Sequence, residues 1–121
     1  MAKILVAEDD ESMLNFLVLA LQRAGHEVTP TSNGLDALSM ITQGNTYDLL
    51  LTDIVMPGMD GVELAKKTSE ITPDTKVMFI TGFAAMAMET AEKNGKKRPK
   101  LLSKPFHLND LVQQVDQVLA D

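Results

Sequence analysis

The sequence predicts an α/β fold with a doubly wound parallel sheet, and two observations carry that prediction. Short apolar runs alternate along the chain with longer segments of helical periodicity, which gives five β/α units. The third and fourth apolar runs show no alternation of polar and apolar residues, as is typical of strands covered by helices on both faces. Right-handed crossovers between such strands place helices on both sides of one sheet.

The first unit pairs a buried strand at residues 3–7 with a helix at residues 11–24. The helix is predicted because its apolar residues recur every three or four positions and so share one face. These residues are Met13, Leu14, Leu17, Val18, Ala20, Leu21 and Ala24. Gly25 follows directly, at the position where glycine commonly ends a helix.

The second unit begins with a strand at residues 26–31 that contains Pro30. Proline has no N–H to donate to a neighbouring strand, so we expect this strand at an edge of the sheet. Ser32 or Asn33 is expected to cap the helix that follows. That helix carries an apolar stripe and ends at Gly44-Asn45.

The third unit has a strand at residues 48–52, followed by turn residues at 56–58. Asp60 and Glu63 form a capping-box-like pair, which predicts a helix that opens there and runs to about Ser69. The fourth and fifth units are less uniform. They comprise strands at residues 76–80 and 100–103, a methionine-rich helix candidate at 84–93, and a clear apolar helical stripe from Leu108 to the C-terminus.

Together these elements predict one flavodoxin-like (βα)5 domain over residues 1–121, with strand order 2-1-3-4-5. This order fits because it makes the strand with Pro30 an edge and puts the first, third and fourth strands side by side at the centre. A length of 121 residues suits one compact domain. No output domain is expected after the last helix.

Composition narrows the functional classes. The net charge of −6 argues against wholesale nucleic-acid binding, and with the absence of a long outer apolar stripe it favours a monomer. The sequence has no cysteine, no signal peptide and no apolar run near membrane-spanning length, so we expect a cytoplasmic protein without membrane contact. Six of the eleven basic residues lie between Lys93 and Lys104, either as a solvated loop or as a docking surface.

Polar residues suited to phosphate and metal follow four of the predicted strands. Glu8-Asp9-Asp10 ends the first strand, Asp53 the third, Thr81 the fourth and Lys104-Pro105 the fifth. Because the carboxyl ends of parallel strands meet at one edge of a sheet, we expect these side chains to share one cleft. Each residue alone also has an ordinary interpretation, such as a helix cap, a strand threonine or an exposed lysine.

The combination predicts a magnesium-dependent aspartyl-phosphate site. A carboxylate oxygen of Asp53 could attack phosphorus and form an acyl phosphate. Carboxylates of Glu8, Asp9 and Asp10 beside it would repel one another unless a cation lay among them, and Mg²⁺ is a hard ion that takes oxygen ligands. Acidic residues also favour the solvated first turn of a helix. That alternative accounts adequately for Asp10 but poorly for Glu8, which is still close to the strand.

The sequence gives less support to nucleotide-binding sites and to phosphatases. The sequence contains neither G-x-x-x-x-G-K-[ST] nor G-x-G-x-x-G. Asp53 is followed by Ile54-Val55, so the second aspartate of haloacid-dehalogenase phosphatases is missing. A true hydrolase of small phosphate esters is therefore the weakest of the hypotheses.

At these residues the chain resembles a two-component response-regulator receiver domain of the CheY-like superfamily, over essentially its whole length. The resemblance is carried by Glu8-Asp9, by Asp53 with Met56-Pro57-Gly58-Met59-Asp60-Gly61, by Thr81-Gly82 and by Lys104-Pro105-Phe106. It implies that Asp53 receives phosphate from the phosphohistidine of a histidine kinase or a histidine phosphotransfer protein. It also implies that Asp9, Asp53 and the Val55 carbonyl ligate Mg²⁺, with Glu8 acting through a water.

The same resemblance implies that Thr81 and Lys104 bind the phosphoryl group, and that the only chemistry is the protein's own phosphorylation and dephosphorylation. Two features depart from the family. Leu101 stands where receivers often have an aromatic switch residue, so we expect output to depend on Thr81 and residues 83–88. The basic stretch 93–98 replaces a turn of small residues.

Residues 51–61 and 77–85 resemble the stand-alone CpdR type of receiver. That group implies a phosphorylation-controlled adaptor for the ClpXP protease or its substrates, active when unphosphorylated. The alternative is a phosphorelay shuttle that passes the group to a histidine phosphotransfer protein.

Overall fold

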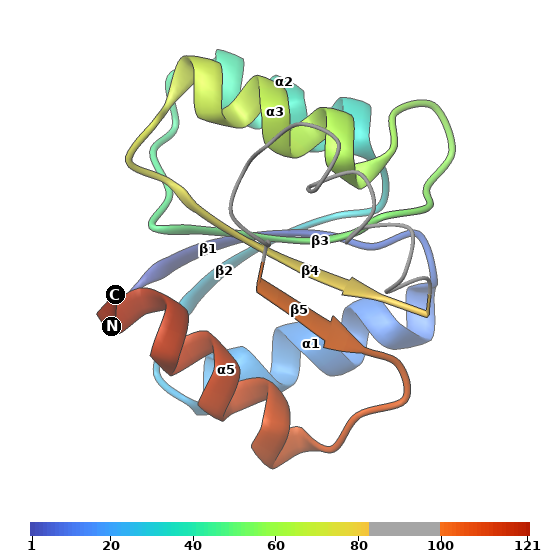
Figure 1. Cartoon of the computed structure of the whole chain (residues 1–121), viewed down its shortest axis with the longest axis vertical. Helices are drawn as coiled ribbons and strands as arrows, with labels where there is room; N and C mark the ends of the chain where they lie inside the picture. Colours follow the sequence, from blue (N-terminus) through green and yellow to red (C-terminus); the bar gives the residue numbers. More distant parts are fainter. Residues whose placement is uncertain (83–99) are drawn as a thin grey trace.

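The computed structural model describes residues 1–82 and 100–121, and its centre is a parallel sheet of five strands. The strands are β1 (Lys3–Ala7), β2 (Glu27–Thr31), β3 (Leu49–Asp53), β4 (Lys76–Thr81) and β5 (Lys100–Ser103). Their order across the sheet is β2-β1-β3-β4-β5, and all four pairings are parallel (Figure 1). The predicted flavodoxin-like order is confirmed, and the strand that carries Pro30 lies at an edge.

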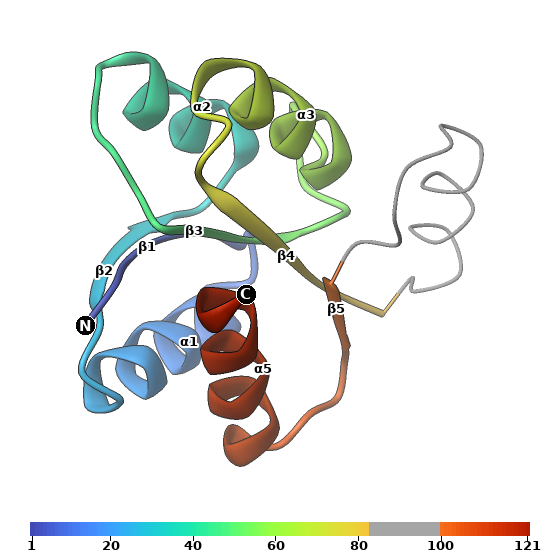
Figure 2. The same ribbon diagram turned by 60° about the vertical axis from the view of Figure 1, so that its left-hand side comes forward.

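Four described helices cover the two faces of this sheet. They are α1 (Glu11–Arg23), α2 (Gly34–Thr42), α3 (Gly61–Ile71) and α5 (Leu108–Ala120). Figures 1 and 2 show α2 and α3 packed on one face and α1 and α5 on the other. Among the described residues, no helix has the length and apolarity needed to cross a membrane.

Three sequence predictions fall on residues 83–99, outside the described part of the chain. They are the helix at 84–93, the output segment 83–88 and the basic stretch 93–98.

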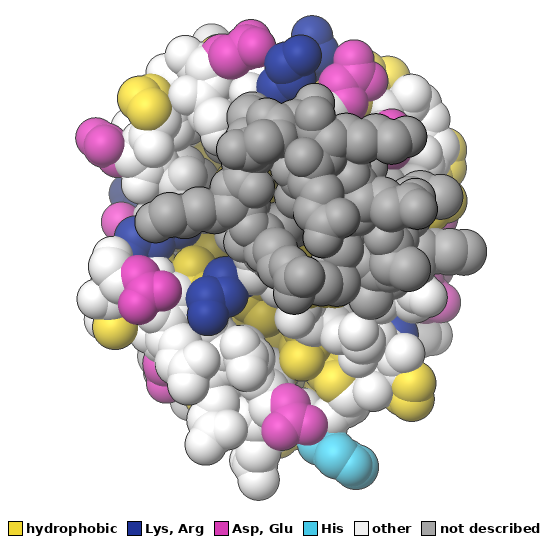
Figure 3. All heavy atoms as spheres, viewed as in Figure 1, with side chains coloured by type: hydrophobic (Ala, Val, Ile, Leu, Met, Phe, Trp, Pro, Cys, Tyr) yellow, Lys and Arg dark blue, Asp and Glu magenta, His cyan; other side chains and the backbone are white. Residues whose placement is uncertain are grey.

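On the face drawn in Figure 3, the described acidic side chains are dispersed, with basic ones between them.

Successive strand residues point to opposite faces, and this divides the core in two. Ile4, Val6, Leu49 and Leu51 pack with Leu17 and Leu21 of α1 and with Leu111 and Val115 of α5. Leu5, Ala7 and Leu50 pack on the other face with Ala37, Ile41 and Leu64 from α2 and α3. All five residues of β3 are buried, as expected for a central strand without alternation.

Side-chain caps set where three of the helices begin. Asp10 accepts a hydrogen bond from the Met13 N–H, and Asn33 accepts one from the Asp36 N–H. Asp60 Oδ1 accepts one from the Glu63 N–H at 2.8 Å, which confirms the predicted cap. Helix α3 continues two residues past the predicted end.

Strand ends differ from the predictions by one residue. Strand β3 covers Leu49–Asp53 rather than 48–52, because Asp53 still pairs with Ile80 in the ladder. Strand β4 likewise includes Thr81, which pairs with Ser103. Both polar residues therefore belong to the sheet itself, where the ladder holds their backbone.

We expect Asp60→Ala to destabilise the fold by about 1 kcal/mol, because the first turn of α3 loses its side-chain acceptor. Urea denaturation of both proteins measures this difference. Asp60→Asn keeps an acceptor oxygen and serves as the matched control. Equal destabilisation by both substitutions would contradict the capping role.

Candidate functional site

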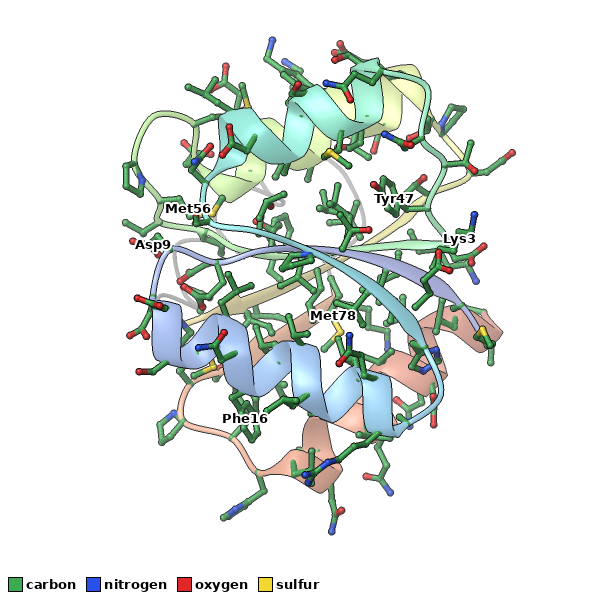
Figure 4. The ribbon with its side chains drawn as sticks, turned by 180° about the vertical axis from the view of Figure 1, so that it is seen from behind. Lys3, Asp9, Phe16, Tyr47, Met56 and Met78 are labelled. Carbon is green, nitrogen blue, oxygen red and sulfur yellow. The ribbon has the colours of Figure 1, made fainter. Side chains whose placement is uncertain are left out.

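The carboxyl ends of four strands place the predicted residues together. Asp53 is the last residue of β3 and Thr81 the last of β4, while Glu8 and Lys104 directly follow β1 and β5. The Lys104 N–H donates to the Thr81 carbonyl at 3.0 Å, which joins the ends of β4 and β5. Figure 4 shows Asp9 and Met56 at this end of the sheet and Lys3 and Tyr47 at the opposite end.

The Lys104 ammonium bridges two buried carboxylates. Its Nζ donates to Glu8 Oε1 at 2.8 Å and to Asp53 Oδ2 at 2.9 Å. Glu8 is 1% exposed and Asp53 is 8% exposed, so water screens these charges poorly. The peptide bond between Lys104 and Pro105 is cis.

The remaining oxygens of both carboxylates accept backbone hydrogen bonds. Glu8 Oε2 accepts one from the Asp10 N–H at 3.1 Å, and Asp53 Oδ1 accepts one from the Ile54 N–H at 2.7 Å. Each carboxylate is thus fixed through both of its oxygens. Asp53 presents its Oδ2, together with the Lys104 ammonium, at the end of the sheet.

The pKa values of Glu8 and Lys104 reflect their burial and the hydrogen bond between them. Burial raises the pKa of Glu8 to about 7, although hydrogen bonds from Lys104 and Asp10 oppose the rise and the charge of Asp53 adds to it. Burial acts to lower the pKa of Lys104, but its hydrogen bonds to Glu8 and Asp53 outweigh burial and raise it. Lys104 is therefore charged at neutral pH, and one ammonium faces more than one carboxylate.

The donor set fits a hard divalent cation. One carboxylate oxygen each from Glu8, Asp9 and Asp53 lies within 4.8 Å of the others. Oxygen donors of this kind suit Mg²⁺, which also relieves the repulsion between the carboxylates. Asp10 instead serves as a helix cap, the alternative that the sequence left open for it, because its carboxylate caps α1.

The functional roles expected for two of the site residues, Thr81 and Val55, remain predictions. Thr81 is completely buried at the end of β4, and its role toward phosphate is inferred from the resemblance. Val55 lies in the loop after β3 with a half-exposed side chain, and its carbonyl as a metal ligand is equally inferred. Leu101, in the usual place of the aromatic switch, packs against the buried pair Ile54 and Phe79.

Two neighbours of Asp53 had no role assigned to them from the sequence. Thr52 Oγ1 donates to the backbone carbonyl of Asp53 at 2.8 Å. Gly61 donates its N–H to the Ile54 carbonyl at 2.7 Å. Threonine is common in strands, so Thr52 gave no local signal, and Gly61 entered only as part of the segment 56–61 that carries the family resemblance.

Comparison with known proteins agrees with this geometry. The response regulator receiver domain family matches residues 4–116. The response regulator receiver protein CpdR of Brucella abortus (strain 2308) is 52% identical over 119 residues, which cover 98% of this chain and 98% of that protein. The sensor kinase CckA of the same strain is 32% identical over 98% of this chain, which spans 12% of the kinase.

A solved structure of similar fold contains a metal. The response regulator TrrA of Thermotoga maritima, in complex with Mg²⁺ and BeF, matches with a TM-score of 0.83 and 29% identity, covering 98% of this chain and 99% of that one.

The raised pKa of Glu8 predicts that the metal-free protein loses stability as pH rises. Between the ordinary pKa of 4.5 and about 7, the folded chain holds a proton that the unfolded chain has released. The free energy of unfolding therefore falls with rising pH in this window. Glu8→Gln removes this titration, so its stability should fall less, by a difference on the order of 1–3 kcal/mol.

Urea denaturation in EDTA at about pH 5 and about pH 7 measures how the free energy of unfolding of wild type and of Glu8→Gln depends on pH. The difference between the two proteins isolates Glu8 from the other carboxyls. Parallel curves for wild type and Glu8→Gln would show that Glu8 has an ordinary pKa in the folded chain.

Proposed function

This chain belongs to the response regulator receiver domain family, and we propose that it is a stand-alone response regulator phosphorylated on Asp53. The observation that carries the proposal is the bridge from Lys104 to Glu8 and Asp53, whose carboxylate oxygens lie with one of Asp9 within 4.8 Å of one another. The phosphoryl donor is the phosphohistidine of a histidine kinase or a histidine phosphotransfer protein. The only reactions of the protein are the gain and loss of this group.

In the proposed transfer, a carboxylate oxygen of Asp53 forms a bond to phosphorus while the bond from phosphorus to the histidine nitrogen breaks. The electron pair of that bond stays on the imidazole of the donor. Lys104 is already hydrogen-bonded to Asp53 Oδ2, so its ammonium is placed to pair with the arriving phosphoryl oxygens. The Thr81 hydroxyl then binds the phosphoryl group.

The residues that would hold Mg²⁺ are Asp9, Asp53 and the Val55 carbonyl, with Glu8 acting through a water. The ion supplies positive charge that stabilises the phosphoryl group during transfer. Glu8 keeps Lys104 in place through its 2.8 Å hydrogen bond, and it adds negative charge that favours the ion. Mg²⁺ therefore belongs to the proposed reaction, and its removal should stop phosphorylation.

We infer a regulated interaction as the output. The similarity to CpdR extends over 98% of both chains, which supports a protein that acts through the surface of its receiver domain. On this basis the chain is a monomeric, cytoplasmic adaptor for ClpXP proteolysis that is active when unphosphorylated. Phosphorylation then shifts an equilibrium between two surface states, to the extent that the phosphoryl contacts favour one of them.

A phosphorelay shuttle is the second candidate. The similarity to a segment of the sensor kinase CckA favours it, since a receiver within a kinase belongs to a chain of phosphoryl transfers. In that case the phosphoryl group leaves Asp53 for a histidine phosphotransfer protein, and no protease is contacted.

Incubation with acetyl phosphate and Mg²⁺ should add one phosphoryl mass to the wild-type protein. Asp53→Asn should gain none, because its amide is not a nucleophile, and EDTA should block labelling of the wild type. Intact mass spectrometry provides the measurement. Labelling of Asp53→Asn would place the phosphoacceptor elsewhere, while continuous hydrolysis of an added phosphate ester, lost in Asp53→Asn, would favour a hydrolase.

An assay with purified proteins distinguishes the adaptor from the phosphorelay shuttle. For an adaptor, purified ClpX should bind the unphosphorylated chain more tightly than the phosphorylated chain, as followed by biolayer interferometry. Asp53→Asn should bind equally well with and without acetyl phosphate. Rapid loss of the label to a purified histidine phosphotransfer protein, without ClpX binding in either state, would contradict the adaptor and support the shuttle.

A further inference from the structure

The backbone carbonyl of Asp53 is confined on two sides. On one side the Thr52 hydroxyl donates to it at 2.8 Å. On the other side Gly61, the first residue of α3, lies so close that an added Cβ would overlap the carbonyl oxygen and lie 2.9 Å from the carbonyl carbon. Thr52 and Gly61 are both buried. The reaction described above uses neither of them.

A short chain of hydrogen bonds connects Gly61 to the Asp53 carboxylate. Gly61 donates its N–H to the Ile54 carbonyl at 2.7 Å, and Ile54 donates its N–H to Asp53 Oδ1 at 2.7 Å. The start of α3 is thereby tied to the two peptides that follow Asp53. The first of these peptides carries the Ile54 N–H that holds Asp53 Oδ1.

Glycine at position 61 is needed for space rather than for an unusual backbone angle. Positive φ angles occur among the described glycines at Gly25, Gly44 and Gly58, and Gly61 is not one of them. A Cβ on Gly61 would also lie 3.0 Å from the Ile54 Cα. All the crowded atoms are backbone atoms, so an alanine here must displace the Asp53–Ile54 peptide or the helix start.

We propose that Thr52 and Gly61 are positioning residues for the phosphoacceptor. They hold the Asp53 peptide so that Oδ1 stays on the Ile54 N–H and Oδ2 stays on Lys104, which keeps the Asp53 carboxylate in the position from which it would bind Mg²⁺. This inference rests on the proposed function, because it takes Asp53 and Val55 as ligands of Mg²⁺. It differs from a purely structural role in that the affinity of the folded protein for the ion depends on it.

The chain offers a matched control at Gly34, the first residue of α2. A Cβ on Gly34 would crowd the Met59 carbonyl and lie 3.2 Å from its carbon, in the same loop between β3 and α3. Gly34→Ala thus crowds this loop through backbone atoms as Gly61→Ala does, but away from Asp53 and Ile54. Thr52→Val is the complementary variant, since it removes the hydrogen bond to Asp53 without adding bulk.

The test measures three quantities on the full chain of each variant: the melting temperature, the Kd for Mg²⁺ by calorimetry, and exchange of the Ile54 amide in metal-free protein by NMR. We expect Gly61→Ala to weaken Mg²⁺ binding about tenfold, as loss of an outer support of a metal ligand commonly does. Thr52→Val should weaken it less, and both should expose the Ile54 amide to faster exchange. Gly34→Ala should lower the melting temperature while its Kd stays at the wild-type value.

Wild-type affinity in a folded Gly61→Ala protein would overturn the proposal. So would an equal loss of affinity in Gly34→Ala, because the effect would then be general crowding of the loop. If Gly61→Ala does not fold, Thr52→Val decides, and an unchanged Kd with unchanged Ile54 exchange overturns it. Failure of wild type to label with acetyl phosphate would instead refute the proposed function, and the Mg²⁺ and exchange measurements would still judge the positioning role.

Discussion

Two buried carboxylates share one ammonium at the carboxyl end of the sheet, and the properties of the site follow from that imbalance. Removing a carboxylate from water costs several kcal/mol unless a charge or hydrogen bonds compensate. Lys104 lies within 2.9 Å of both Glu8 and Asp53, and each carboxylate also accepts a backbone N–H. With Asp9 added, negative charge still exceeds positive charge, so the site favours a further cation, while burial, with the charge of Asp53 adding to it, raises the pKa of Glu8.

The fold supplies the rigidity that such a cluster requires. Asp53 is the last paired residue of β3, a strand buried along its whole length between two apolar clusters. The next residue, Ile54, packs in the core beside Phe79 and Leu101. The Asp53 carboxylate is therefore attached to the packed interior, next to a residue that contacts side chains of β4 and β5. Sites on strand ends hold their geometry better than sites on free loops.

Much of this arrangement could be predicted because it depends on local patterns. The apolar runs identified the strands, Pro30 identified the edge, and Asp60 identified the start of α3. The convergence of Glu8, Asp53, Thr81 and Lys104 followed from one rule, that parallel strands end at the same edge. The limits of β3 and β4 were wrong by one residue, because hydrogen bonds from the neighbouring strand, which no local pattern encodes, extend the ladder through Asp53 and Thr81.

The sequence by itself therefore determined the type of sheet, its strand order and the residues gathered at its carboxyl end, since these depend on periodicity and chain direction. Only the tertiary structure decided how the gathered charges are divided. It assigned Asp10 to the cap of α1, placed Lys104 between Glu8 and Asp53, and brought Gly61 against the Asp53 carbonyl. Such contacts join residues from separate crossovers, and their distances are set by how the helices pack on the sheet.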